Sequence, residues 1–113
     1  MATVRIVKSL LRQIIKKFKG ESHKVLDLIS SLESSPKKGK LLGVVGGLLI
    51  KELKYRSFRF YFIQESKNLK VLSEDDLRDL LITFVRMSDK NSQQRTINEI
   101  KFILKKIGPQ GFV

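Results

Sequence analysis

The spacing of apolar residues changes along the chain, and this change restricts the possible folds more than any other feature of the sequence. Residues 7–32 carry apolar side chains at intervals of three and four, which is typical of helices with one buried face. Residues 48–63 and 80–86 instead hold short runs of aliphatic and aromatic residues, which favour extended strands. Helical spacing returns over residues 97–107. This order predicts an α+β fold, in which an N-terminal helical hairpin packs on a small twisted antiparallel sheet and a C-terminal helix follows.

The N-terminal part of the chain predicts a short strand followed by two helices. Apolar and polar residues alternate over residues 4–6, which indicates the strand. The first helix is expected to start near Val7 and to end at Gly20, and Ser22 is placed to cap a second helix that runs to about Leu32. The expected buried stripe of the second helix consists of Val25, Leu28, Ile29 and Leu32. Because both helices are short and amphipathic, we expect them to pack as an antiparallel hairpin.

The middle of the chain predicts a β-hairpin. A polar loop at residues 34–40 ends the helical part, and two strands follow at 48–53 and 58–63, joined by a polar link at 54–57. Alternation assigns the side chains of the second strand to two faces: Phe58, Phe60 and Phe62 to the core, and Arg59 and Tyr61 to the outer face.

The chain after residue 63 allows two interpretations. A polar turn at 64–68 precedes a possible strand at 69–72. Residues 74–79 then form either a short helical turn before a strand at 80–86, or part of a helix that continues through Leu81. We prefer the first, because the β-branched and aromatic residues after Leu81 favour an extended chain.

A last helix completes the predicted fold. Its cap is expected at Asp89, Asn91 or Ser92, and Gly108 with Pro109 is expected to end it. The chain has 113 residues, of which 42% are hydrophobic, so it is long enough to build one modest core. We therefore expect residues 1–113 to form a single domain.

The charge of the chain points to a polyanionic partner. Lys and Arg number 23 and Asp and Glu number 11, which leaves a net charge of +12. Residues 1–40 hold ten basic and three acidic side chains, residues 41–72 hold six and two, and residues 73–113 hold seven and six. The positive surface is therefore expected to come from the first two thirds of the chain. An excess of this size attracts nucleic acid.

Several kinds of chemistry are excluded by composition. The chain has no cysteine, which rules out a thiolate nucleophile and favours a reducing, cytoplasmic location. His23 is the single histidine and is interpreted as an ordinary helix residue, so neither a metal centre nor another cofactor is expected. The longest apolar stretch, Leu41–Ile50, is about half the ~20 residues that span a bilayer, and no signal peptide is evident. The glycines of Gly43–Gly47 lack the Gly-Lys-Ser/Thr ending of a phosphate loop, which excludes nucleotide binding.

The remaining candidates for chemistry are basic residues on the predicted strands. They are Lys51, Lys54, Arg56, Arg59 and Arg86. Arginine offers phosphate a rigid fork of donors, and lysine acts as a point charge or a proton acceptor. A basic sheet face with Tyr55 or Tyr61 available for stacking suits single-stranded RNA.

Three motifs in this order resemble the RelE/HigB family of toxins from toxin–antitoxin systems. Residues 49–54, LIKELK, precede a short turn and residues 58–62, FRFYF, as in the family pattern of a strand ending Glu-Leu-Arg/Lys followed by Tyr-Arg-hydrophobic-Tyr/Phe. Residues 80–86, LLITFVR, resemble the aliphatic strand of the family that ends in Phe and a basic residue. Lys90 and residues 99–100 resemble its closing Lys and Glu-Ile segment. The resemblance covers roughly residues 41–107.

The resemblance implies an endoribonuclease that cuts messenger RNA in the ribosomal A site without a metal. In this family the ribose 2′-hydroxyl attacks the adjacent phosphate and leaves a cyclic phosphate. Carried over by position, Arg59 would stabilise the charge that develops on the phosphoryl group, Lys54 would assist proton transfer or bind phosphate, and Arg86 would be a further phosphate ligand or acid. The candidate RNA-binding residues are Lys51, Arg56, Tyr61, Lys90 and Arg95.

The resemblance also implies partners and leaves alternatives open. The expected partners are messenger RNA, the ribosome and an antitoxin whose acidic or amphipathic segment covers the basic face. Glu52 stands where RelE-like members often carry a second basic residue, and Arg86-Met87 replaces a doubled lysine. A non-catalytic RNA- or ribosome-binding module and a ParE-like gyrase inhibitor are the two alternative functions.

Overall fold

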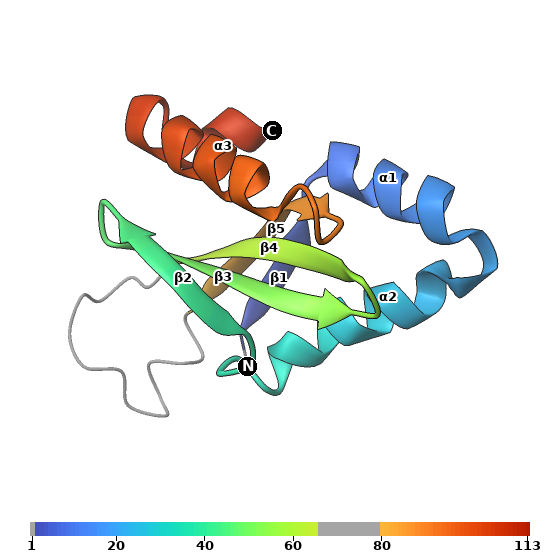
Figure 1. Cartoon of the computed structure of the whole chain (residues 1–113). Helices are drawn as coiled ribbons and strands as arrows, with labels where there is room; N and C mark the ends of the chain where they lie inside the picture. Colours follow the sequence, from blue (N-terminus) through green and yellow to red (C-terminus); the bar gives the residue numbers. More distant parts are fainter. Residues whose placement is uncertain (1, 66–79) are drawn as a thin grey trace.

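The computed structural model describes residues 2–65 and 80–113, which form an α+β fold (Figure 1). The strands are β1 (Thr3–Ile6), β2 (Lys40–Val45), β3 (Leu48–Tyr55), β4 (Phe58–Glu65) and β5 (Leu81–Ser88). The α-helices are α1 (Lys8–Phe18), α2 (Ser22–Ser30) and α3 (Gln93–Lys106). Short 3-10 turns are η1 (Lys19–Glu21), η2 (Ser31–Glu33) and η4 (Pro109–Phe112). The expectations for residues 66–79, including the strand at 69–72 and the helical turn at 74–79, lie outside the described residues.

The five strands form one mixed sheet in the order β1-β5-β4-β3-β2. The pairs β3–β4 and β4–β5 are antiparallel, as expected, and the pair β2–β3, which was not expected, is antiparallel as well. β1 instead runs parallel to β5, with Thr3 opposite Leu81 and Ile6 opposite Phe84. The expected purely antiparallel sheet is therefore wrong. A parallel partner requires a long crossover connection, and the whole chain between β1 and β5 provides one.

The N-terminal helices do not show the expected antiparallel hairpin. α1 passes into α2 through the single turn η1, without a non-helical loop between them (Figure 1). The residue with a positive φ at the end of α1 is Lys19 (φ 48°) rather than Gly20. Ser22 is the first residue of α2 and not its cap, and its hydroxyl donates a hydrogen bond to the carbonyl of Ile14 at 3.3 Å. This bond links the two helices at their junction.

An unexpected strand, β2, lies at one edge of the sheet. Gly46 and Gly47 have φ values of 55° and 81°, and they form the two-residue turn that joins β2 to β3. Two consecutive positive φ values suit the twist of a tight hairpin, and glycine adopts them without steric cost. β2 contains the first half of the apolar stretch Leu41–Ile50, for which no strand was predicted, and it brings Lys40 opposite Glu52.

Both faces of the sheet are covered. On one face Phe18 of α1 packs against the aromatic rings of Tyr55, Phe58 and Phe60, at centroid distances of 5.6, 5.3 and 5.9 Å. The apolar residues of α1 and α2 that complete this core are Leu10, Ile14, Val25 and Ile29. Leu32, in η2, is also buried, as expected, whereas Leu28 is only partly buried.

The C-terminal helix α3 packs on the opposite face, over β2 and β5 (Figure 1). Of the apolar residues at helical spacing over residues 97–107, Ile100 and Leu104 are buried, but Ile107 is 59% exposed. This helix covers the face of β4 that carries Arg59 and Tyr61, which was expected to meet solvent. Arg59 and Tyr61 do alternate with the phenylalanines, but Arg59 is only 8% exposed and Tyr61 is fully buried. The expectation that this face is open was wrong because α3 covers most of it.

Candidate functional site

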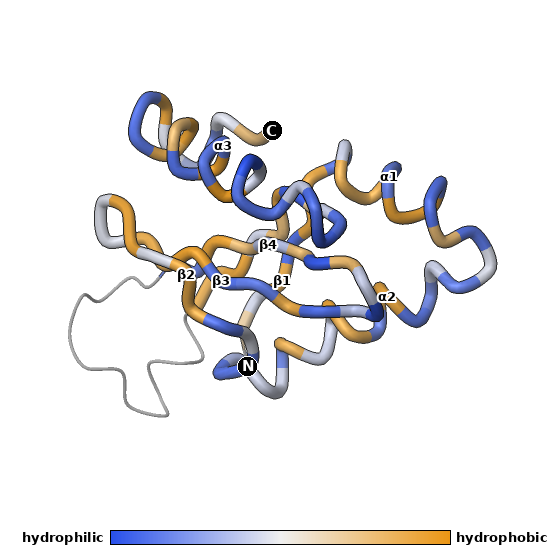
Figure 2. Tube along the Cα trace, viewed as in Figure 1, coloured by the Kyte–Doolittle hydropathy of each residue, from blue (hydrophilic) through white to orange (hydrophobic). Residues whose placement is uncertain are grey.

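The β3–β4 hairpin places two of the predicted catalytic residues side by side. Lys54 on β3 lies directly opposite Arg59 on β4 in the antiparallel register. Directly opposite side chains in such a pair lie on the same face, with their Cβ atoms about 4.5–5.5 Å apart. Figure 2 shows that β3 changes from hydrophobic to hydrophilic toward this end. The two cations therefore share one surface at the turn end of the sheet.

A pocket opens at this position. It has a volume of about 390 Å³ and is lined by residues 39–40, residues 52–54, Arg59 and Gln93. This volume lies within the range of about 300–1,000 Å³ for small-ligand sites. Strands β3 and β4, the start of β2 and the first residue of α3 each contribute to its lining. We call it the Lys54–Arg59 pocket.

Arg59 is held firmly in the wall of this pocket. Its Nη1 donates to the carbonyl of Ser57 at 3.3 Å. With the amide of Gln93 turned so that its oxygen faces the guanidinium, that oxygen accepts from Nε, from Nη2 at 3.0 Å and from Nη1 at 3.1 Å. Among residues 2–65 and 80–113, no carboxylate lies within 4.0 Å of Arg59. Its positive charge is therefore directed to the pocket rather than neutralised by an ion pair in the described part of the chain.

A carboxylate also lines the Lys54–Arg59 pocket. Glu52 is 7% exposed and lies on the same face of β3 as Lys54. It stands between Tyr61 on β4 and Lys40 on β2, each directly opposite it in the register. The pocket thus contains both an acidic and several basic groups.

Tyr61 lies beneath this surface and not on it. Its hydroxyl is 2.8 Å from the Ser88 hydroxyl, and its ring is fully buried. Burial raises the pKa of Tyr61, while the hydrogen bond with Ser88 acts in the opposite direction. In this conformation the ring cannot stack on a base, so the structure does not place Tyr61 as an RNA contact.

Arg86 shares the face of the pocket but has other partners. It lies opposite Tyr61 on β5. Its Nε donates to Glu99 of α3 at 2.7 Å, and its guanidinium carbon lies 5.1 Å from the centre of the Phe112 ring. These contacts tie β5 to the C-terminal segment, and Arg86 does not line the Lys54–Arg59 pocket.

Lys51 lies on the opposite face of the sheet from Lys54. Its Nζ is 3.5 Å from both the Lys37 carbonyl and the Gln64 side-chain oxygen, and 5.7 Å from the centre of the Phe62 ring. Burial lowers the pKa of Lys51. It supports the loop before β2, and the structure does not bring it together with Arg59.

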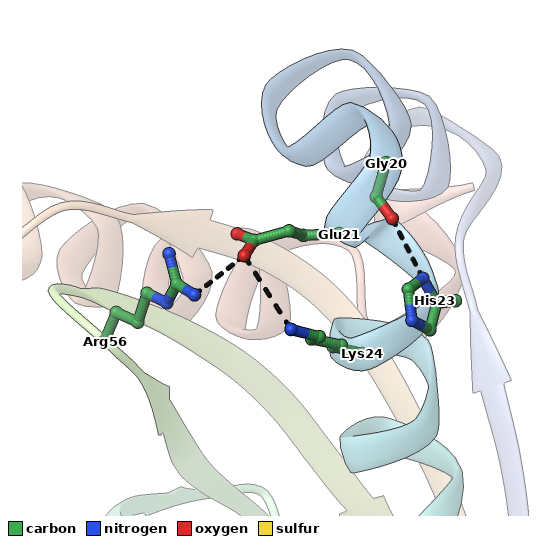
Figure 3. A network of polar contacts seen from close by, with 5 residues as sticks. All are labelled: Gly20, Glu21, His23, Lys24 and Arg56. Carbon is green, nitrogen blue, oxygen red and sulfur yellow. Dashed lines mark hydrogen bonds and ion pairs between the residues drawn. The ribbon is translucent and has the colours of Figure 1, made fainter.

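Arg56 is engaged at the β3–β4 turn (Figure 3). It adopts a φ of 56°, and its Nη2 donates to the Glu21 carboxylate at 2.7 Å. Lys24 lies 3.9 Å from the same carboxylate, and the His23 ring nitrogen is hydrogen-bonded to the carbonyl of Gly20. This network, drawn in Figure 3, joins the turn to η1 and α2.

The last two predicted RNA-binding residues are exposed. Lys90 lies in the loop between β5 and α3, and Arg95 lies in the first turn of α3. This loop begins next to Ser88, which pairs with Arg59. Lys90 and Arg95 therefore lie near the same end of the sheet as the pocket, although neither lines it.

Sequence reasoning missed several residues at this end of the molecule. Lys40 and Gln93 line the pocket because β2 and the start of α3 meet there. A second pocket of about 440 Å³ lies toward α1, and it is lined by Gln13, Lys16, Lys17, Phe58, Met87, Ser88 and Asp89. Hydrogen bonds from Ser92 lower the pKa of Asp89 in this pocket. The only sign of this second pocket in the sequence was the run of basic residues in α1, and such a run indicates a solvated helix face just as well.

The described part of the chain, residues 2–65 and 80–113, contains no cluster of three or more potential metal ligands. Within the same residues, no helix combines the length and the apolar character needed to cross a bilayer. Comparisons of the chain with protein-family models, with curated proteins and with solved structures found no match.

Proposed function

We propose that this protein is a RelE/HigB-type toxin, a metal-independent endoribonuclease that cuts messenger RNA at the ribosome. The proposal rests on the order of the sequence motifs, on the net charge of +12 and on the chemistry of one pocket. The cross-strand pair of Lys54 and Arg59 in that pocket is the observation that supports it most strongly. The α+β order of elements is compatible with the RelE-like fold that the proposal requires.

The pocket offers the groups that phosphodiester transesterification needs. In this reaction the ribose 2′-oxygen attacks the adjacent phosphorus, and negative charge accumulates on the non-bridging oxygens. The Arg59 guanidinium is fixed by Gln93 and Ser57 in the wall of the pocket, so its charge needs little reorganisation as negative charge develops on the phosphate. Lys54 is exposed beside it and can bind the same phosphate or give a proton to the departing 5′-oxygen.

The surroundings of the pocket suit a chain of nucleotides rather than a single phosphate. Lys16 and Lys17 of α1 line the neighbouring pocket, and the Nζ of Lys17 lies 5.2 Å from the centre of the Phe58 ring. We propose that RNA crosses the turn end of the sheet, with the scissile phosphate at Arg59 and a flanking phosphate near these lysines. Phosphate contacts of this kind make binding strongly dependent on salt.

The partners and the location follow from the proposed activity. The substrate would be messenger RNA on the ribosome, in the cytoplasm, and an antitoxin would cover the basic surface. An acidic segment would complement the excess of Lys and Arg in this surface. Such binding would block access to the Lys54–Arg59 pocket.

One observation favours a second candidate function. Arg59 is only 8% exposed, so RNA reaches its guanidinium only from the pocket side. A protein that binds RNA through Lys54, Lys16 and Lys17 without cutting it would tolerate such a buried arginine. This non-catalytic module predicts salt-dependent affinity without scission.

The test is to express the wild type and Arg59→Ala under tight induction and to map messenger-RNA 5′ ends by primer extension. Lys105→Ala is the matched control, because it removes one exposed charge near the end of α3, outside both pockets. We expect new 5′ ends in translated regions with the wild type and Lys105→Ala, and a roughly 100- to 1,000-fold lower cleavage rate with Arg59→Ala. Intact messenger RNA with the wild type would exclude the endonuclease and leave the binding module.

A further inference from the structure

Another pocket lies at β1, the edge strand opposite β2, where β1 passes into α1 and the C-terminal segment approaches them (Figure 1). It has a volume of about 470 Å³. It shares no lining residue with the Lys54–Arg59 pocket or with the pocket that contains Lys17. We call it the Arg5–Arg12 pocket, and its lining consists of residues 5–9, Arg12, Thr83, Phe112 and Val113.

Three cations from two elements line the Arg5–Arg12 pocket. Arg5 belongs to β1, and Lys8 and Arg12 belong to the first turns of α1. Because residues 8 and 12 are four apart, their side chains lie on the same face of the helix. The Nη2 of Arg5 donates to the Thr83 hydroxyl at 3.4 Å, across the β1–β5 pair. All three basic side chains are exposed, so their charges are accessible to a ligand that enters from solvent.

No acidic side chain balances these charges. The lining of the pocket contains neither Asp nor Glu. Within residues 2–65 and 80–113, no carboxylate lies within 4.0 Å of Arg5, Lys8 or Arg12. The first turn of α1 holds no acidic residue either, although negative charge is favoured at that end of a helix. Cations gathered in this way repel one another, and a bound anion would remove this repulsion.

The rest of the lining is mostly apolar. Val7 and Phe112 are buried, Ile6 is partly buried, and Ser9 adds a hydroxyl group. Sites for small molecules typically have volumes of about 300–1,000 Å³ and combine apolar walls with a few polar groups that orient the ligand. The Arg5–Arg12 pocket therefore suits a small ligand with an anionic end and an apolar body.

We propose that the Arg5–Arg12 pocket binds a small phosphate monoester with an apolar organic body. Such a phosphate carries a charge of about −1.5 to −2 at pH 7, so it compensates more of the three cations than a single carboxylate would. The guanidinium groups of Arg5 and Arg12 and the ammonium group of Lys8 donate to its oxygens, and the apolar body packs against Ile6 and Phe112. This site lies apart from the Lys54–Arg59 pocket and does not depend on RNA cleavage.

The test is a titration of the purified, ¹⁵N-labelled protein with phenyl phosphate and with inorganic phosphate, followed by the NMR signals of the backbone amides. We expect saturable shifts over residues 5–12 and tighter binding of phenyl phosphate, because only its ring removes apolar surface of the pocket from water. Lys8→Gln and Arg12→Gln should each bind phenyl phosphate about tenfold more weakly, since each removes a charged hydrogen-bond donor. Lys105→Gln is the matched control for Lys8→Gln, because it removes an exposed lysine of α3 outside the pocket, and it should bind like the wild type.

Three results would overturn the proposal. Equal weakening by Lys8→Gln and Lys105→Gln would mean that phosphate is attracted by the basic surface as a whole and not by this pocket. Equal affinity for phenyl phosphate and inorganic phosphate would remove the apolar part of the site. Displacement of phenyl phosphate by an RNA oligonucleotide with a 5′-hydroxyl end would assign the pocket to the RNA-binding surface instead of a small molecule. The amide spectrum also reports whether each variant is folded, and if Lys8→Gln does not fold, Arg12→Gln decides.

Discussion

Gly39 joins the lysine-rich loop to β2 where the chain passes directly over the aromatic core, so replacing it by alanine is a sensitive test of the structure. Gly39 has a φ of 105°, and a Cβ atom built on it would lie 2.7 Å from the ring carbon Cζ of Phe62 and 3.2 Å from the carbonyl oxygen of Glu52. Phe62 is fully buried and packs against Phe84 at a centroid distance of 4.7 Å, so it has little room to move. Gly39→Ala therefore combines backbone strain with overpacking.

The magnitude follows from these two contributions. A residue other than glycine in such a backbone conformation costs about 1–3 kcal/mol, and overpacking of a filled core typically costs about 1–3 kcal/mol. Gly39→Ala is thus expected to lose roughly 2–6 kcal/mol of unfolding free energy, out of about 5–15 kcal/mol for a typical domain. At ~4 °C per kcal/mol for a domain of this size, Tm should fall by roughly 8–24 °C.

Two other glycines separate the contributions. Gly46 has a φ of 55° but nothing within 4 Å of its added Cβ, so Gly46→Ala should lose only the backbone part, about 1–2 kcal/mol. A Cβ atom added to Gly20 would have no neighbour within 4 Å, and Gly20 has no positive φ. The unfolding free energy of Gly20→Ala should therefore lie within about 1 kcal/mol of the wild-type value. Urea unfolding followed by far-UV circular dichroism measures all three. If Gly39→Ala proved as stable as Gly46→Ala, the close approach to Phe62 would be wrong.

Three further substitutions test separate parts of the molecule. Tyr61→Phe removes the buried bond to Ser88 and should cost about 1 kcal/mol in urea unfolding, and the double variant with Ser88→Ala should cost less than the sum of the single changes. Lys51→Met should stabilise the protein at pH 7, because burial lowers the pKa of Lys51 and so makes the charged ammonium unfavourable in the folded state. This unfavourable contribution is fully present below the folded-state pKa and fades as pH rises toward 10.5, the unfolded value. The gain in unfolding free energy from Lys51→Met, measured in urea at pH 7 and again near pH 10.5, should therefore be smaller at the higher pH. Glu99→Ala breaks a partly exposed ion pair with Arg86 and should shift the thermal unfolding free energy by about 1 kcal/mol or less.

The change of apolar spacing was sufficient to predict the kind and order of most elements. Helical spacing located α1, α2 and α3, and the aromatic run located β4, because each of these segments buries one continuous set of side chains. The prediction of β5 was also confirmed. The edge strand β2 was missed because its glycines were weighed only as a phosphate loop. The Gly46-Gly47 pair was the signal for a two-residue hairpin turn.

The candidate site was less accessible to sequence reasoning. A strict period of two places Lys51 and Lys54 on opposite faces of one strand, and grouping them by charge overlooked this. The exposure of Arg59 and Tyr61 could not be read from β4, because it depends on α3, which folds back from the far end of the chain onto the same face. Local patterns fix which face a side chain takes, whereas tertiary packing decides what covers that face.

The parallel pair of β1 and β5 has a consequence for how the protein folds. Arg5 and Thr83, which meet across this pair, are 78 residues apart in sequence. The chain must therefore close a long loop before β1 can pair with β5, and such nonlocal pairing slows folding. During synthesis the β2–β3–β4 meander can form as soon as its residues are made, but β1 must wait for β5. The N-terminal strand is thus made first and is expected to be among the last elements to join the sheet.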